Sequence, residues 1–326
     1  MYKKLNSKTL LIILAILVAL VVVVTIYDSK KGERSFRAEM IDADTAKITK
    51  VVIDPKAEKS DVIELTKQSD GWHVSSGKST YRADEMMINN ILTTFREMKP
   101  LRMIANDKSR WGDYDVTDSS ATKIKIFTGK KLASNLYVGR FNYQQPKNSN
   151  PQQYSYNQQR GTMTTYVRLA DEKAVYIVEG FLGMSFNRNL NDYRDKTVIR
   201  SNKEDWTRLT FTYPADSSFT LSKENGKWMV NGLLADSASV AGYLNTISHL
   251  TSQNFADDTK PLSTEAVYSL SIDGNNFPKP LHIEALPADS VNKFLISSSL
   301  NEGIMFSGEK SGLTGKVFVS KSKFIK

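Results

Sequence analysis

The sequence contains no cysteine among its 326 residues. Disulfide bonds, thiolate nucleophiles, cysteine-ligated zinc and a lipid-modified cysteine anchor are therefore excluded. Any folded part of the chain has to be stabilised by non-covalent packing, even if it lies outside the cytoplasm.

Histidine and nucleotide-binding motifs are also scarce. The three histidines, His73, His249 and His282, are far apart and form no i, i+4 pair of the kind that binds zinc on a helix. None of the four Gly-Lys pairs has the glycine five positions earlier that a phosphate-binding loop requires, and G-x-G-x-x-G and G-x-S-x-G are missing. We expect no catalytic residues, no cofactor, no metal site and no enzyme activity.

Carboxylates are plentiful but carry no catalytic signature. Asp113 and Asp115, for example, are expected on one side of a strand. Glycoside hydrolysis needs two acids at a defined separation in space, which spacing along the chain does not reveal. Acids near turns more often cap helices or face water.

Charge gives no indication of a nucleic-acid partner. The chain has 44 Lys and Arg against 35 Asp and Glu, a net charge of +9, and three of the lysines precede residue 10 without any acid. Basic residues elsewhere are interspersed with acids instead of clustering in one segment. We therefore expect no binding of nucleic acid.

One long apolar run stands near the N-terminus. Leu10–Tyr27 is eighteen residues without a charge. As a helix it would be about 27 Å long, close to the roughly 30 Å thickness of the bilayer interior. It exceeds the apolar region of a cleaved signal peptide, and no small-x-small site follows it. We predict an uncleaved transmembrane anchor. Its representative residues are Leu10, Leu14, Leu17, Val21, Val24 and Tyr27.

The flanking charges predict the orientation of this anchor. Lys3, Lys4 and Lys8 form an acid-free flank, whereas the basic residues after the run are mixed with acids. We expect residues 1–34 to comprise a cytoplasmic tip, the anchor and a linker. The protein would be a single-pass protein of a bacterial inner membrane with its C-terminal part in the periplasm.

The first half of the chain predicts a hairpin followed by a helix. Residues 62–65 read as a strand, 69–71 as a turn and 72–74 as the returning strand. Asp84 can then cap a helix with apolar residues at positions 4, 7, 8 and 11 beyond it. These apolar residues are Ile88, Ile91, Leu92 and Phe95.

The second half repeats this pattern. Phe219 and Leu221 precede a turn at residues 225–226, residues 228–230 return, and Asp236 precedes a second helix. Its apolar residues stand at the same four positions beyond the aspartate. They are Val240, Tyr243, Leu244 and Ile247. The chain therefore reads as two copies of one β-rich unit.

Two looser correspondences extend the predicted repeat. Trp111–Val116 followed by residues 123–127 corresponds to residues 267–270 followed by 281–283, and residues 173–177 correspond to 315–319. We predict an α+β fold in which an N-terminal transmembrane helix precedes two β-rich units, each covered by an amphipathic helix. The units are residues 45–185 and 206–326, joined by a link at 186–205. The residues that mark the repeat are Gly71, Trp72, Asp84, Gly226, Trp228 and Asp236.

The segment 141–161 has no counterpart in the second half. It contains six Gln, four Asn and no acid, which is typical of an inserted surface loop. The functional alternative is a contact arm for a partner, because tyrosines offer large contact area at low entropic cost. The candidate contact residues are Tyr143, Tyr154, Tyr156 and Arg160.

These features together resemble a bacterial family defined as domain of unknown function 4340. The resemblance rests on the anchor, the Trp hairpins, the two Ala-Asp helix starts, Trp111–Val116 and Tyr193–Lys196, and it covers most of residues 45–260. It implies an extracytoplasmic accessory subunit of a membrane complex, with an ABC-type permease and ATPase or other integral membrane proteins as partners. It supplies no catalytic residues.

The expected function is a non-enzymatic accessory or scaffold subunit of an ABC-type transport or envelope complex. A periplasmic glycan- or peptide-binding module, which would use Trp and Tyr faces and the 141–161 segment, is the alternative. A cell-wall hydrolase is the third hypothesis, and it requires two convergent carboxylates in a cleft.

Overall fold

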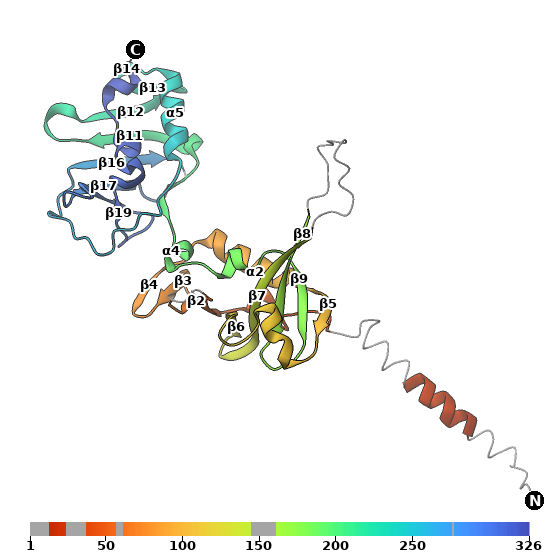
Figure 1. The fold of residues 1–326 in the computed structure, drawn as a ribbon. Coiled ribbons are helices and arrows are strands. Elements are labelled where there is room, and N and C mark those ends of the chain that lie inside the picture. Colours follow the sequence, from red (N-terminus) through yellow and green to blue (C-terminus); the bar gives the residue numbers. More distant parts are fainter. Residues whose placement is uncertain (1–12, 24–36, 57–60, 145–160, 276, 326) are drawn as a thin grey trace, which may run out of the picture. The chain divides into compact units, whose positions relative to one another are not determined.

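The computed structural model describes residues 13–23, 37–56, 61–144, 161–275 and 277–325 (Figure 1). The chain divides into two compact units. Unit 1 comprises Met1–Thr80 and Met86–Arg188, and unit 2 comprises Tyr81–Glu85 and Asn189–Lys326. Both are rich in strands and contain a few helices, so the β-rich α+β class predicted from the sequence is observed.

The first sheet has nine strands in the order β4-β3-β2-β1-β6-β7-β8-β9-β5. Neighbouring strands from β3 to β5 in this order pair antiparallel. The strands are β1 (Lys50–Asp54), β2 (Ile63–Gln68), β3 (Gly71–Ser76), β4 (Ser79–Arg82), β5 (Pro100–Ala105), β6 (Thr122–Thr128), β7 (Lys131–Gln144), β8 (Thr162–Leu169) and β9 (Val175–Glu179).

Alternating side chains explain which face of this sheet is buried. In β1 and β6 every second residue is buried, as expected for strands with one face on the core. In β9 four consecutive residues are buried. The core of unit 1 therefore lies against one face at β1 and against both faces at β9.

Short helices complete unit 1. The longest, α2 (Glu85–Glu97), buries Ile88, Ile91 and Phe95, and the Phe95 ring stacks on Phe186 at a centroid distance of 5.4 Å. The others are η1 (Thr45–Lys47), η2 (Lys108–Tyr114) and α3 (Gly183–Phe186).

The second sheet has eight strands in the order β14-β13-β12-β11-β16-β17-β18-β19. A separate two-stranded sheet pairs β10 with β15. The strands of unit 2 are β10 (Thr197–Arg200), β11 (Trp206–Thr212), β12 (Phe219–Glu224), β13 (Lys227–Val230), β14 (Leu233–Leu234), β15 (His249–Thr251), β16 (Tyr268–Gly274), β17 (Leu281–Pro287), β18 (Phe294–Ser298) and β19 (Phe306–Ser307).

Helices cover the core of unit 2. Val240, Tyr243, Leu244 and Ile247 of α5 (Ser237–Ile247) join one buried cluster with strand residues such as Leu209. The cluster also takes in Leu313 and Val317 of α6 and Phe324 of η6. The remaining helices are α4 (Leu190–Tyr193), η3 (Lys203–Asp205), η4 (Ala215–Ser217), η5 (Lys310–Gly312), α6 (Leu313–Val317) and η6 (Lys321–Phe324).

The β12–β13 hairpin follows directly from its turn residues. Asn225 and Gly226 both have positive φ, at 49° and 79°, as a type I′ turn requires. In the β2–β3 hairpin the turn residues are 69 and 70, and Gly71 (φ 130°) is the first residue of β3. The two glycines therefore occupy different places in otherwise similar hairpins.

The two strand orders correspond position by position. β14, β13, β12, β11, β16, β17, β18 and β19 take the places of β4, β3, β2, β1, β6, β7, β8 and β9. In addition, α5 lies between β14 and β15 in the chain as α2 lies between β4 and β5. β15 differs from β5 because it pairs with β10.

This order corrects both looser correspondences. By position, β6 at residues 122–128 matches β16, whereas residues 281–283 belong to the next strand, β17. Residues 315–319 form no strand, because Leu313 and Val317 are four residues apart and are both buried by the one-turn helix α6. The strand in the place of β9 is β19.

The expectation of a strand carrying Asp113 and Asp115 is also wrong. These residues lie in and just after the 3₁₀ helix η2, which begins where the Asp107 side chain accepts a hydrogen bond from the Ser109 N–H. Asp115 follows the helix in a left-handed conformation.

The described part of the N-terminal apolar run is a helix over residues 13–23. Among the residues that the structure describes, no helix is both long and apolar enough to cross a membrane.

Candidate functional site

The hairpin tryptophans occupy equivalent register positions. Trp72 lies opposite Lys67 in the β2–β3 pair, and Trp228 lies opposite Lys223 in the β12–β13 pair. Both are half-buried, and Trp228 packs against the core of unit 2. Neither lines either of the two pockets described below.

The two aspartates stand at helix starts. The Asp236 side chain accepts a hydrogen bond from the Ser239 N–H at 2.9 Å and so caps α5. Asp84 directly precedes α2, and its carboxylate lies 3.9 Å from the Lys196 ammonium. Both residues shape the fold.

The predicted anchor and contact arm are described only in part. Leu14, Leu17 and Val21 lie in the helix of residues 13–23 and are more than half exposed. Tyr143 lies on β7 with 48% exposure. The other predicted residues lie outside the described ranges, and they are Leu10, Val24, Tyr27, Tyr154, Tyr156 and Arg160.

The Trp111–Val116 segment covers a buried arginine. Arg168 is 2% exposed, and its guanidinium carbon lies 3.6 Å from the Trp111 ring centre and 4.0 Å from that of Tyr137. It donates a hydrogen bond to the Val116 carbonyl at 3.2 Å. Burial lowers the pKa of Arg168, but an arginine stays charged at neutral pH. The segment thus stabilises a buried cation in unit 1.

The Tyr193–Lys196 segment contains a second buried arginine, Arg194, in unit 2. Arg194 is 1% exposed and lies between the Tyr81 and Phe255 rings, at 3.5 and 3.6 Å from their centres. Both its terminal nitrogens donate to the Asp257 carboxylate, one of them at 2.8 Å to Oδ1. The bidentate geometry and the stacking together stabilise the buried charge.

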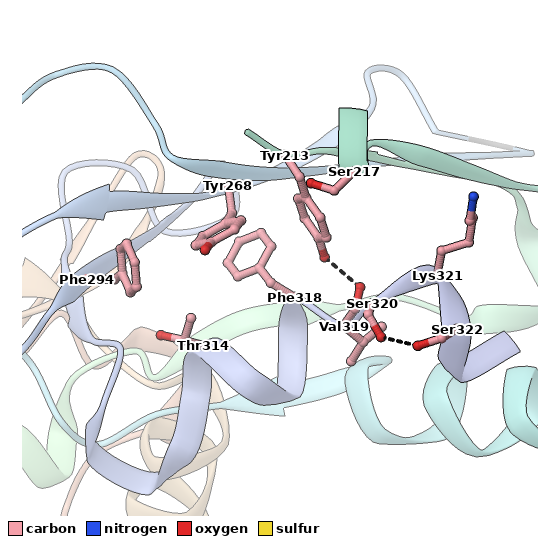
Figure 2. Close-up of a pocket in the computed structure, with 10 residues that line it drawn as sticks. All are labelled: Tyr213, Ser217, Tyr268, Phe294, Thr314, Phe318, Val319, Ser320, Lys321 and Ser322. Carbon is pink, nitrogen blue, oxygen red and sulfur yellow. Dashed lines mark hydrogen bonds between the residues drawn. The ribbon is translucent and has the colours of Figure 1, made fainter. Parts of the chain in front are cut away.

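A pocket of about 520 Å³ lies in unit 2 (Figure 2). Its walls come from the end of β11, from η4 and from the starts of β16 and β18, and the segment from α6 to η6 closes it. The lining residues are Tyr213, Ser217, Tyr268, Phe294, Thr314, Phe318, Val319, Ser320, Lys321 and Ser322.

Four aromatic rings form one wall. Tyr268 is the central ring, with centroids 5.2 Å from Tyr213, 5.3 Å from Phe294 and 5.7 Å from Phe318. The first two contacts are edge-to-face, at 89° and 70°. Such contacts hold the rings in place, and all four remain partly exposed at the pocket.

Two tyrosine hydroxyls hold the segment that closes the pocket. Tyr213 donates to the Val319 carbonyl at 2.9 Å, and Tyr243 donates to the Val317 carbonyl at 2.6 Å. Burial raises the pKa of both tyrosines above the ordinary value, so both hydroxyls keep their protons. Fully buried Phe324 fixes the far end of the segment.

The lining of the pocket carries one charge, which is positive. Among its ten lining residues there is no acid, and Lys321 carries the one charge. Figure 2 shows Lys321 with Ser320 and Ser322 on the opposite side of Tyr213 from Phe294. The site therefore has an aromatic end and a polar, cationic end.

A second pocket, of about 380 Å³, lies in unit 1. Its lining includes two exposed carboxylates. Glu97 is the last residue of α2, and Glu179 is the last residue of β9. Phe181 also lines it and packs on Phe141 at a centroid distance of 4.5 Å. Two carboxylates, those of Glu97 and Glu179, therefore line this pocket.

Histidine contributes to neither pocket. His73 lies 3.5 Å from Asp70, and no group of three or more His, Asp or Glu residues in the described ranges is arranged to bind a metal.

Sequence reasoning missed the pocket of unit 2. Its residues run from Tyr213 to Ser322 and form no motif, because they come from separate strands and from the segment between α6 and η6, which the fold brings together. One signal was present. Residues 310–325 contain four lysines, Lys310, Lys316, Lys321 and Lys323, and no acid.

One comparison with known proteins gives a match. The model of a family described as Domain of unknown function (DUF4340) matches residues 72–270, more than half of the chain. That range includes both hairpin tryptophans, both helix starts, Trp111–Val116 and Tyr193–Lys196, so the resemblance predicted from these residues is confirmed. No curated protein and no solved structure matches the chain.

Proposed function

The chain belongs to the DUF4340 family, and from that premise we propose that it is a non-enzymatic, extracytoplasmic accessory or scaffold subunit of an ABC-type transport or envelope complex. In this proposal Leu10–Tyr27 anchors it in a bacterial inner membrane as a single-pass protein. The units that follow would face the periplasm and contact a permease, an ATPase-coupled partner or another integral membrane protein.

The observation that carries this proposal is the exposure of the N-terminal apolar helix. Every residue from 13 to 23 is exposed, with large apolar side chains such as Ile13 at 44% and Val23 at 62%. A continuous apolar surface of this kind is rarely left in contact with water. A bilayer or the helices of a membrane partner would cover it.

We further propose that the two units are copies of one β-rich repeat. The matched strand orders support this, as does the shared register in which Trp72 faces Lys67 and Trp228 faces Lys223. Two similar surfaces on one chain would suit a scaffold, because linked binding sites raise the effective concentration of a partner.

Affinity purification tests the accessory role. The full-length protein, tagged at its C-terminus, is recovered from mildly solubilised native membranes and its companions are identified by mass spectrometry. We expect a permease and an ATPase. A matched chain in which residues 10–27 are replaced by an unrelated transmembrane helix separates recruitment by the helix from recruitment by the units. Recovery of the bait alone, together with normal transport in a deletion strain, would contradict the proposal.

A binding module for envelope glycan or peptide is the second candidate, and the pocket of unit 2 favours it. A volume of about 520 Å³ falls within the range of small-ligand sites, and an aromatic wall beside a few polar groups is their usual chemistry. This candidate is compatible with the accessory role.

A cell-wall hydrolase is the third candidate, favoured by Glu97 and Glu179 on the pocket of unit 1. Two carboxylates in a cleft are the minimum for glycoside hydrolysis. Incubation of the purified protein with peptidoglycan tests it, with Glu97→Gln and Glu179→Gln as controls. Under the accessory proposal we expect no release of fragments, whereas release that both substitutions abolish would establish the hydrolase.

A further inference from the structure

We propose that the pocket of unit 2 binds a small carboxylate that bears an aromatic or branched apolar group, either as a free acid or as the C-terminal residue of a peptide. This inference rests on the binding-module candidate and names its ligand class. It does not depend on the accessory role.

The aromatic end selects the apolar group. Tyr268, Phe294 and Phe318 are held by mutual ring contacts of 5.3 and 5.7 Å and are each partly exposed. An inserted ring or branched side chain would displace water from these faces and add further ring contacts. This end offers few groups that would bind a charge.

The opposite end selects an anion. Lys321 is exposed, and in the part of the chain that the structure describes no carboxylate lies within ion-pair distance of its ammonium group. Ser320 and Ser322 stand beside it with their hydroxyl oxygens 2.7 Å apart. A carboxylate could accept hydrogen bonds from the ammonium and from a serine hydroxyl.

The charges near the pocket also favour a negatively charged ligand. Residues 310–325 carry four lysines and no acid, and they provide the segment that closes the pocket. A positive field of this kind attracts small anions and repels cations. A neutral sugar fits less well, because the ten lining residues include no carboxylate or amide side chain to accept its many hydroxyl donors.

Hydrogen bonds fix the backbone at one side of the pocket in the absence of a ligand. The hydroxyls of Tyr213 and Tyr243 fix the carbonyls of Val319 and Val317, between which Phe318 presents its ring. A preorganised site loses less conformational entropy on binding than a mobile one. Lys321 is exposed, and its long side chain has the rotatable bonds to bring the ammonium to the carboxylate.

Calorimetric titration of the full-length chain in nanodiscs tests the proposal with four probes. N-acetylphenylalanine and 3-phenylpropanoate represent a peptide end and a free acid, N-acetylphenylalanine amide lacks the charge, and chitobiose represents a neutral glycan. We expect both acids to bind and the amide to bind about tenfold more weakly. Tighter binding of N-acetylphenylalanine identifies a peptide end, and tighter binding of phenylpropanoate identifies a free acid.

Three variants locate the binding. Lys321→Met should weaken both acids about tenfold and leave the amide unchanged. Lys316→Met, which removes an exposed lysine of α6 that does not line the pocket, should weaken the two acids far less than Lys321→Met does. Phe294→Ala should weaken the acids and the amide alike, with circular dichroism used to verify its fold.

Several outcomes would overturn the proposal. Equal affinity for the acid and the amide would show that the ligand's negative charge is not recognised. An unchanged affinity of the acids for Lys321→Met would show that they do not bind at Lys321. Binding of chitobiose alone would refute the ligand class while leaving the binding-module candidate intact. Failure of all four probes would refute the inference without affecting the accessory role, which co-purification tests separately.

Discussion

The Arg194–Asp257 pair predicts an asymmetric response to mutation. Replacement of Asp257 by Asn leaves a guanidinium that is 1% exposed without its counter-charge. Removing one partner of a buried pair destabilises proteins by about 3–5 kcal/mol. Because the Asp257 side chain is 34% exposed, we expect the lower end of this range, about 3 kcal/mol.

Replacement of Arg194 by Met should have a smaller effect. The methionine can still fill the space between the Tyr81 and Phe255 rings, and the remaining aspartate is exposed enough to be hydrated. We expect a loss of about 1 kcal/mol, since apolar replacements of buried ion pairs are often nearly neutral. The double variant should also lose about 1 kcal/mol, far less than the sum of the two single effects.

Hydrogen exchange measured by mass spectrometry can resolve these differences within the full-length chain. A loss of 3 kcal/mol corresponds to about a hundredfold lower protection of the slowest amides in β11, β16 and β17. Peptides from β6 and β8 of unit 1 provide an internal control in the same sample. If Arg194→Met reduced protection more than Asp257→Asn did, the charge argument would be refuted, and packing by the arginine stem would have to be the main contribution.

Three further predictions concern single positions. Asp236→Ala should destabilise α5 by about 1 kcal/mol while Asp236→Ser retains most of the cap, as read from exchange of the α5 amides. Gly139→Ala should lower the melting temperature of unit 1, because the new Cβ would lie 2.1 Å from the Tyr114 carbonyl oxygen, and overpacking of this kind costs about 1–3 kcal/mol; an unchanged melt would contradict that close approach. Burial raises the pKa of Tyr243, so its contribution to the stability of unit 2 should be complete below about pH 10 and fall as the pH rises further. Tyr243→Phe should lower the free energy of unfolding by about 1–3 kcal/mol at pH 7, since the Val317 carbonyl loses its donor. Between pH 7 and 11, however, the melting temperature of this variant should fall less steeply with pH than that of the parent protein.

Local patterns were sufficient to predict the two hairpins and the helices α2 and α5. The Asn225-Gly226 pair specifies its own turn, and the spacing of apolar residues after Asp236 specifies which face of α5 is buried. Each of these two patterns lies within a dozen residues, so it can be read without knowledge of the rest of the fold.

Contacts between distant residues could not be predicted in this way. Trp111 meets Arg168, and Arg194 meets Asp257, only in the folded chain, because 57 and 63 positions separate the partners in the sequence. The lack of such contacts also explains why residues 123–127 were matched with residues 281–283. The two sequences are similar, but 281–283 lie in β17, one strand beyond the position that corresponds to β6. For the same reason the pocket of unit 2 was not found.

The segment that closes this pocket has a consequence for how the chain is made. Phe324 packs against Phe219 and Tyr243, so the cover of these two rings is synthesised well after the rings themselves. Until residues 313–324 have been synthesised, those aromatic rings lack their cover and are open to chaperones or to aggregation. A nascent chain arrested before residue 313 should therefore bind a holdase, and a chain extended through residue 324 should no longer bind it.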